Sequence, residues 1–155
     1  MQLKHLYSVL MLAGCIPFVI AAAMPYFESH ELPVFGNVHR SIAFYSLALV
    51  SFMAGIQWGS ALTSHGSDQP SHKKPINTHL ALIVSNAFVI APWFVLCSVG
   101  VGVGFYFLIA LSFILMAMND YRLAERRINS NHYCRLRVVA TAIIVPCLIS
   151  LAFTV

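Results

Sequence analysis

The segment THLALIVSNAFVIAPWFVLCSVGVGVGFYFLIALSFILMAM, residues 78–118, decides the fold of this chain. It runs for 41 residues without one Asp, Glu, Lys or Arg. A single straight helix of that length would reach about 61 Å, roughly twice the hydrocarbon core of a membrane, so the segment must turn back on itself. Gly100 opens a run with glycine at every second position, where a helix is weak and left-handed backbone angles cost little. Two helices are therefore predicted, Thr78–Ser98 and Val101–Met118.

Three other stretches of the chain are equally free of charge. They are Leu6–Pro25, Ser41–Thr63 and Val138–Val155. Each is long enough to cross lipid as a helix, and none alternates polar and apolar residues as the strands of a membrane barrel do. Only 9% of the 155 residues are charged and 59% are hydrophobic, which excludes a soluble domain. We predict an all-α polytopic membrane protein, a single domain over residues 1–155 with five transmembrane helices in one bundle, the third and fourth forming a tight hairpin.

The distribution of basic residues predicts the orientation. With five crossings, the N-terminus and segments 64–77 and 119–137 share one side, which holds eight of the nine Lys and Arg residues; Arg40 alone lies on the other. Cytoplasmic loops are enriched in Lys and Arg, so the N-terminus is expected in the cytoplasm and the C-terminus in the periplasm. The first apolar run is long for a cleaved signal, and no Arg- and Ser-rich leader precedes it. These features favour the bacterial inner membrane.

Small residues recur in the second stretch. Ser51, Gly55 and Gly59 repeat every four residues and share one face of a helix. Such faces allow close helix approach, so we predict that this face packs against another helix of the chain, a second copy or another subunit. The amide of the neighbouring Gln57 needs a partner in lipid, and Trp58 suits the membrane interface. Both are candidates for contacts between helices or for lining a ligand pocket.

Other polar residues give weaker indications. Asn86, in the middle of 78–98, needs a hydrogen-bond partner from another helix, and His79 at the inner end is a candidate ligand contact. No acidic, basic or histidine residue falls at mid-depth, as ion-coupled carriers require, and no metal-ligand spacing is present. We therefore predict no catalytic residue, metal or cofactor. Basic residues beside the last two stretches are predicted to contact anionic lipid headgroups: Arg122, Arg126, Arg127, Arg135 and Arg137.

Short motifs in three of the stretches resemble a known family. They are Ile16-Pro17-Phe18, Phe52-x-x-Gly55-x-x-Trp58-Gly59 and Tyr133-x-x-Leu136-Arg137. In these motifs the chain resembles the bacterial and mitochondrial membrane family grouped as domain of unknown function 3429, to which the animal transmembrane protein 69 belongs. The resemblance covers nearly the whole chain and implies a small inner-membrane protein without an established activity. Where this family carries a basic residue before the Trp-Gly pair, the chain has Gln57.

The leading functional hypothesis is a non-catalytic accessory, scaffold or assembly protein of the inner membrane. It follows from the lack of mid-membrane charge, of a nucleophile with an adjacent base, and of loops long enough for a soluble catalytic domain. The expected partners are membrane lipids and, through the second stretch, a membrane protein or a second copy. Nucleic acid is not expected, because the basic residues lie beside the membrane.

Two alternatives remain open. The first is a passive channel or carrier for a small neutral solute, which would use Gln57, Asn86 and the helix breaks at Pro17, Pro92 and Pro146. The second is a protein that binds or modifies a lipid or quinone at the cytoplasmic interface. Residues suited to that second role are Trp58, His79, Tyr121 and Arg137.

Overall fold

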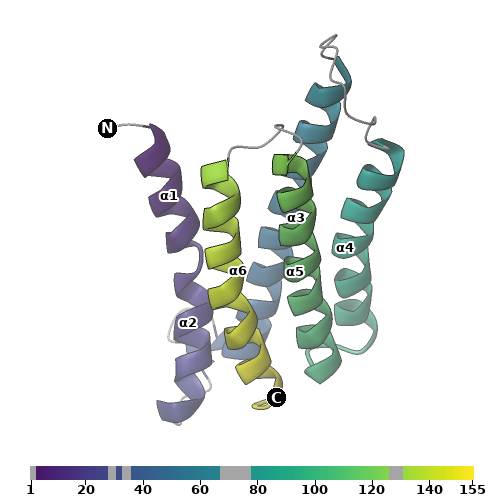
Figure 1. The fold of residues 1–155 in the computed structure, drawn as a ribbon. Helices are drawn as coiled ribbons and strands as arrows, with labels where there is room; N and C mark the ends of the chain where they lie inside the picture. The colour runs from purple at the N-terminus through teal and green to yellow at the C-terminus, as the bar shows by residue number, and fades with distance from the viewer. Residues whose placement is uncertain (1–2, 28–30, 33–35, 67–77, 126–130) are drawn as a thin grey trace.

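The computed structural model describes residues 3–27, 31–32, 36–66, 78–125 and 131–155, which are almost entirely helical (Figure 1). The elements in chain order are α1 (Leu3–Ala13), α2 (Ile16–Ala23), the 3₁₀ turn η1 (Met24–Phe27), β1 (Glu31–Leu32), β2 (Gly36–Asn37), α3 (Val38–Gly66), α4 (Thr78–Ser98), α5 (Val103–Glu125) and α6 (Asn131–Ala152). The two short strands pair antiparallel, with Glu31 opposite Asn37.

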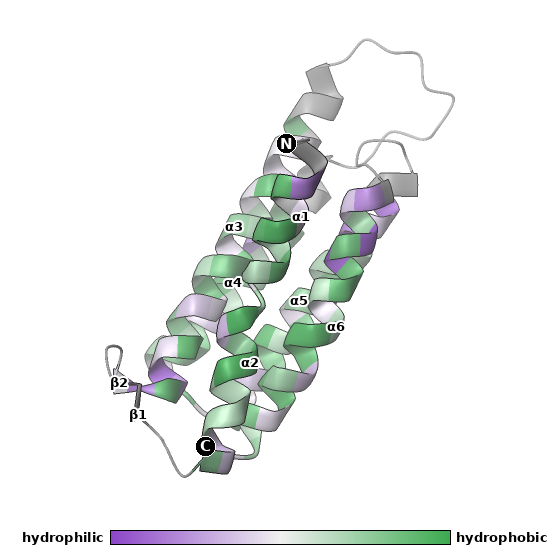
Figure 2. Ribbon diagram, turned by 90° about the vertical axis from the view of Figure 1, so that its left-hand side faces the viewer, coloured by the Kyte–Doolittle hydropathy of each residue, from purple (hydrophilic) through white to green (hydrophobic). Residues whose placement is uncertain are grey.

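Long apolar helices dominate the described residues. Four are long and apolar enough to cross a membrane, and α4 adds a shorter apolar segment, Leu82–Ser98. The four are Ser8–Phe27, Val38–Ser60, Val103–Arg122 and His132–Ala152. Figure 2 shows hydrophobic residues along the helices and hydrophilic ones mainly near their ends. The chain is thus a helical membrane protein, as predicted.

The helices lie side by side in one bundle (Figure 1). α5 and α6 pack along each other, and α3 lies behind them, in contact with α4 and α5. α1 and α2 flank α6 on the opposite side of the bundle from α4. The start of α1 and the C-terminus lie at opposite ends of the bundle.

Two helices extend well beyond the charge-free stretches. α5 begins at Val103 and continues to Glu125, whereas the sequence stretch ended at Met118. α6 begins at Asn131, two turns before Val138. Apolar composition indicates where a helix crosses lipid, but a helix continues for as long as its backbone hydrogen bonds are satisfied. The extensions place several charged residues inside helices.

The first apolar stretch is broken between α1 and α2. Pro17 has no N–H, and Phe18 donates its backbone N–H to Cys15 at 3.1 Å instead of to Gly14. The carbonyl of Gly14 is therefore left without its helical donor. The hydroxyl of Tyr45, on α3, donates to it at 3.0 Å. Because an unsatisfied carbonyl is costly away from water, this hydrogen bond stabilises the break and joins α3 to the first two helices.

The long apolar segment 78–118 is interrupted within its glycine run. α4 ends at Ser98 and α5 begins at Val103. Gly100 has a φ of 86° and donates its N–H to Leu96 at 3.1 Å, which ends α4 in the left-handed conformation that glycine adopts readily.

The core lies where α2, α3, α5 and α6 meet. Phe113 of α5 is buried and packs edge-to-face on Phe18 of α2, with ring centroids 6.0 Å apart. Tyr45 lies on the same Phe18 ring at 5.4 Å. Where α3 and α5 begin, His39 Nδ1 and the buried Tyr106 hydroxyl are hydrogen-bonded at 2.9 Å.

Replacing Tyr45 with phenylalanine keeps the ring contact but removes the donor to Gly14. We expect the free energy of unfolding in detergent to fall by about 0.6 kcal/mol, and by at most about 1.7 kcal/mol, the average and the maximum for hydrogen bonds between membrane helices. Equilibrium unfolding in mixed micelles measures the change. Tyr26→Phe is the control, because Tyr26 is 80% exposed. Equal stability of the two variants would show that the Gly14 carbonyl finds another donor.

Candidate functional site

A buried polar network joins three helices at the end where α5 finishes and α6 begins. Gln57 of α3, Asp120 of α5 and Arg137 of α6 are only 4%, 1% and 1% exposed. Arg137 Nε lies 3.1 Å from Asp120 Oδ2, forming an ion pair. Gln57 Nε2 donates to Asp120 Oδ1 at 3.2 Å and to the Met116 carbonyl at 3.1 Å. One carboxylate thus holds together α3, α5 and α6.

Further groups complete the polar network. Asn119 Nδ2 donates to Gln57 Oε1 at 3.2 Å, so both ends of the Gln57 amide are used. The thiol of Cys134 donates to the Asp120 carbonyl at 3.4 Å. Within the described residues, the Tyr133 hydroxyl and Arg137 Nη2 are buried without a hydrogen-bond partner. The hydrogen-bonding groups of Gln57 are therefore more fully paired than those of Arg137.

The positions of the charged pair follow from helical spacing. The inward face of α5 includes Phe113 and Met116, and Asp120 continues it four residues later. On α6, Arg137 stands three residues before the buried Ala140. Both charges thus occupy positions that normally carry core hydrophobic residues. A charge at such a position needs an opposite charge, because desolvation in a bundle is expensive.

The sequence predicted that Arg137 contacts lipid headgroups, and this prediction is wrong. Arg137 is buried against Asp120. The reason is that α6 begins at Asn131, which places Arg137 well inside the helix on its inward face. Arg122 and Arg135 are exposed. Arg126 and Arg127 lie outside the described residues. Headgroup contact by these four stays a prediction.

The face formed by Ser51, Gly55 and Gly59 points outward. A Cβ atom added at Gly55 or Gly59 would meet no described atom within 4 Å. The Ser51 hydroxyl donates to the Leu47 carbonyl of its own helix at 2.8 Å. Within the described residues, no atom of another helix therefore lies against the Cβ positions of Gly55 and Gly59. A spacing of four defines a face, but it does not determine which neighbour that face meets. Contact with a second copy or another subunit stays a prediction.

The remaining sequence candidates are dispersed. Asn86 is exposed on α4, and among the described residues no hydrogen bond reaches its amide. Trp58 is 38% exposed on α3. His79 belongs to α4, but its side chain lies outside what the structure describes. The structure therefore unites Gln57 with Arg137, and it adds Asp120 and Asn119, which the sequence argument did not single out.

Removing one member of the ion pair should destabilise the bundle strongly. We expect Asp120→Leu or Arg137→Met alone to lower the free energy of unfolding by about 3–5 kcal/mol, because the other charge stays buried and unpaired. The double variant should recover most of that loss, since apolar residues of similar volume replace both charges. Equilibrium unfolding in mixed micelles measures all three.

Arg135→Met is the matched control for this cycle. Arg135 is exposed on the same helix, so its replacement should change stability by less than about 0.5 kcal/mol. If the loss of unfolding free energy in the double variant equals the sum of the losses in the two single variants, Asp120 and Arg137 do not stabilise each other.

Comparison with known proteins places the chain in one family. A family model described as a protein of unknown function, DUF3429, matches residues 3–153. No curated protein and no solved structure matches the chain. The matched region includes every described helix from α1 to α6 and the whole polar network. The chain belongs to the DUF3429 family.

Proposed function

We propose that the chain is a non-catalytic accessory or assembly protein of the bacterial inner membrane. Its partner is another membrane protein, which it contacts through the outward faces of α3 and α4. The observation that carries this proposal is the exposed amide of Asn86, in the apolar part of α4.

An amide facing lipid is unfavourable. Burying such a group without a hydrogen bond costs about 1–3 kcal/mol in proteins. Within the described chain no side chain relieves this cost at Asn86. A polar or backbone group of a neighbouring protein helix would do so, because polar side chains join helices in membranes.

The small-residue face of α3 supports the same proposal. A Cβ added at Gly55 or Gly59 would meet no described atom within 4 Å, so there is open space beside both glycines. Phe52 and Trp58 are exposed beside them. A partner helix could approach the glycines closely and gain van der Waals contact there.

The interior of the bundle favours a structural role over a reaction. Its buried charges, Asp120 and Arg137, contact each other, and Gln57 bridges α3 to them. These groups join helices. A solute pathway would find both ends of the Gln57 amide already engaged.

For the membrane arrangement, we propose five crossings with a cytoplasmic N-terminus. In this arrangement α1 and α2 together make the first crossing, and α4 and α5 form a hairpin around Gly100. The 21 residues of α4 give a length of about 31 Å, enough for one crossing. The placement of the chain ends at opposite ends of the bundle supports an odd number of crossings.

Association should depend on the outward faces of α3 and α4. We expect Gly55→Leu with Gly59→Leu, and separately Asn86→Leu, to reduce recovery of one specific membrane protein about tenfold when the tagged chain is purified in mild detergent. Quantitative mass spectrometry measures the recovery. The substitutions should leave the fold intact, because added side chains at both glycines enter space that no described atom occupies.

Gly104→Leu provides a matched control. Gly104 also lies in a helix with no described atom near an added Cβ, but it is on α5. Its recovery of the partner should equal that of the unmodified chain. Recovery that no variant changes, or a chain that associates only with itself, would contradict the accessory role.

The proposed orientation can be tested with fused reporters. Alkaline phosphatase fused after Val155 should be active and a fluorescent protein there dark, because the positive-inside distribution puts the C-terminus in the periplasm. Fusing the same reporters after Glu125, in a chain truncated there, removes α6 and should reverse both signals: the phosphatase should be inactive and the fluorescent protein bright. Fluorescence at Val155 would contradict the orientation.

A further inference from the structure

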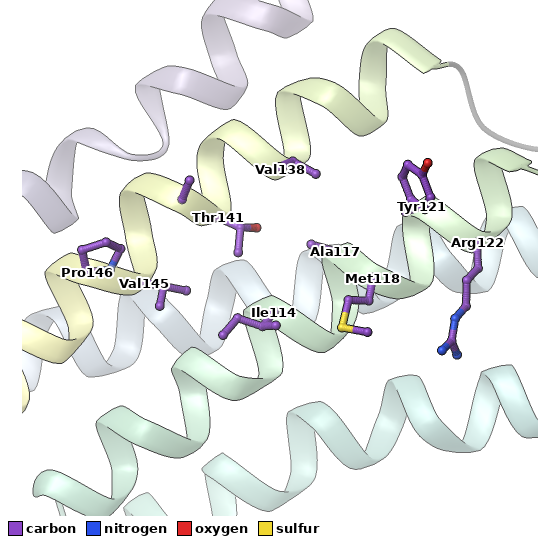
Figure 3. A pocket seen from close by; sticks show the side chains of 10 residues that line it. Ile114, Ala117, Met118, Tyr121, Arg122, Val138, Thr141, Val145 and Pro146 are labelled. Carbon is purple, nitrogen blue, oxygen red and sulfur yellow. The ribbon is translucent and has the colours of Figure 1, made fainter.

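A groove lies between α5 and α6 on the outer surface of the bundle (Figure 3). Its volume is about 540 Å³. Ile114 and Met118 of α5 and Val138 of α6 line it, and all three are substantially exposed. Ala117 and Ala142 also line it, and because their side chains are small they do not fill the space between the two helices.

The length of the groove corresponds to one leaflet of a membrane. From Arg122 to Ile114 along α5 the rise is about 12 Å, and from Val138 to Pro146 along α6 it is the same. One leaflet contributes about 15 Å of hydrocarbon. The groove therefore extends from the end of α5 to near the middle of the bilayer.

The two ends of the groove differ in polarity. Tyr121 and Arg122 lie at one end, and Val145 and Pro146 at the other (Figure 3). Arg135 adds a second cation, because it is exposed three residues before Val138 and hence on the same face of α6, one turn beyond the groove. Two helices thus present positive charge at the end near the membrane surface.

We propose that this groove binds an anionic phospholipid of the adjacent leaflet. An acyl chain lies along Ile114 and Val145, and the phosphate contacts Arg122 and Arg135. The phenol of Tyr121 suits the boundary between them, since its ring is apolar and its hydroxyl polar. A neutral quinone would occupy the apolar part but would itself bring no counter-charge to either arginine. The site is separate from the partner-binding faces of α3 and α4.

Native mass spectrometry of the full chain tests the proposal. The chain is purified, stripped of lipid and returned to mixed micelles holding equal amounts of phosphatidylglycerol and phosphatidylcholine. The unmodified chain should retain one phosphatidylglycerol. Arg122→Gln and Arg135→Gln should each lower the ratio of bound phosphatidylglycerol to phosphatidylcholine about fivefold, as expected for one basic residue near anionic lipid.

Two variants on α6 separate the groove from general lipid contact. Ala142→Phe fills the groove from an exposed position, so it should remove the retained lipid while the chain stays folded. Val139→Phe adds the same ring at an exposed residue outside the groove and should bind as the unmodified chain does. Circular dichroism and thermal unfolding verify the fold of each variant.

Several results would overturn the proposal. One is equal retention of phosphatidylglycerol by the Ala142→Phe and Val139→Phe variants, which means only unspecific lipid contact. A second is an unchanged lipid ratio in both arginine variants. A third is a quinone retained from native membranes and displaced by Ala142→Phe, while phosphatidylglycerol does not compete with it.

Discussion

The contact between Asp120 and Arg137 constrains the rest of the bundle. Each charge is buried on a different helix, at a position where water does not replace its partner. Rotation of α5 or α6 about its axis would separate the charges and leave both unpaired. Gln57 extends the same constraint to α3. The pair therefore sets the facing surfaces of three helices, against which α1, α2 and α4 pack.

The helical membrane fold was predictable from the sequence, but the polar network was not. Long charge-free stretches and the glycine run at 98–104 are properties of single segments, and the structure breaks its helices in that run. Asp120 and Arg137 fall just outside the charge-free stretches. Their signal was the spacing from Met116 to Asp120 and from Arg137 to Ala140, which continues two buried faces. Hydropathy hides such faces, because lipid-facing and core-facing residues are both apolar.

The outward faces show a second limit of sequence reasoning. The spacing of Ser51, Gly55 and Gly59 correctly places them on one helix face, yet a Cβ added at Gly55 or Gly59 would meet no described atom within 4 Å. Small residues favour close packing equally well within a chain and between chains. Likewise, the chemistry of Asn86 predicts that its amide needs a hydrogen-bond partner, whereas the sequence does not identify that partner.

The ion pair also bears on how the chain enters the membrane during synthesis. Asp120 lies near the end of α5 and Arg137 near the start of α6, the next helix in the chain. Either helix alone would present a charge on its inward face without the opposite charge that neutralises it. Association of α5 with α6 before either packs elsewhere would neutralise both charges. α3, made earlier, already offers Gln57 to receive them.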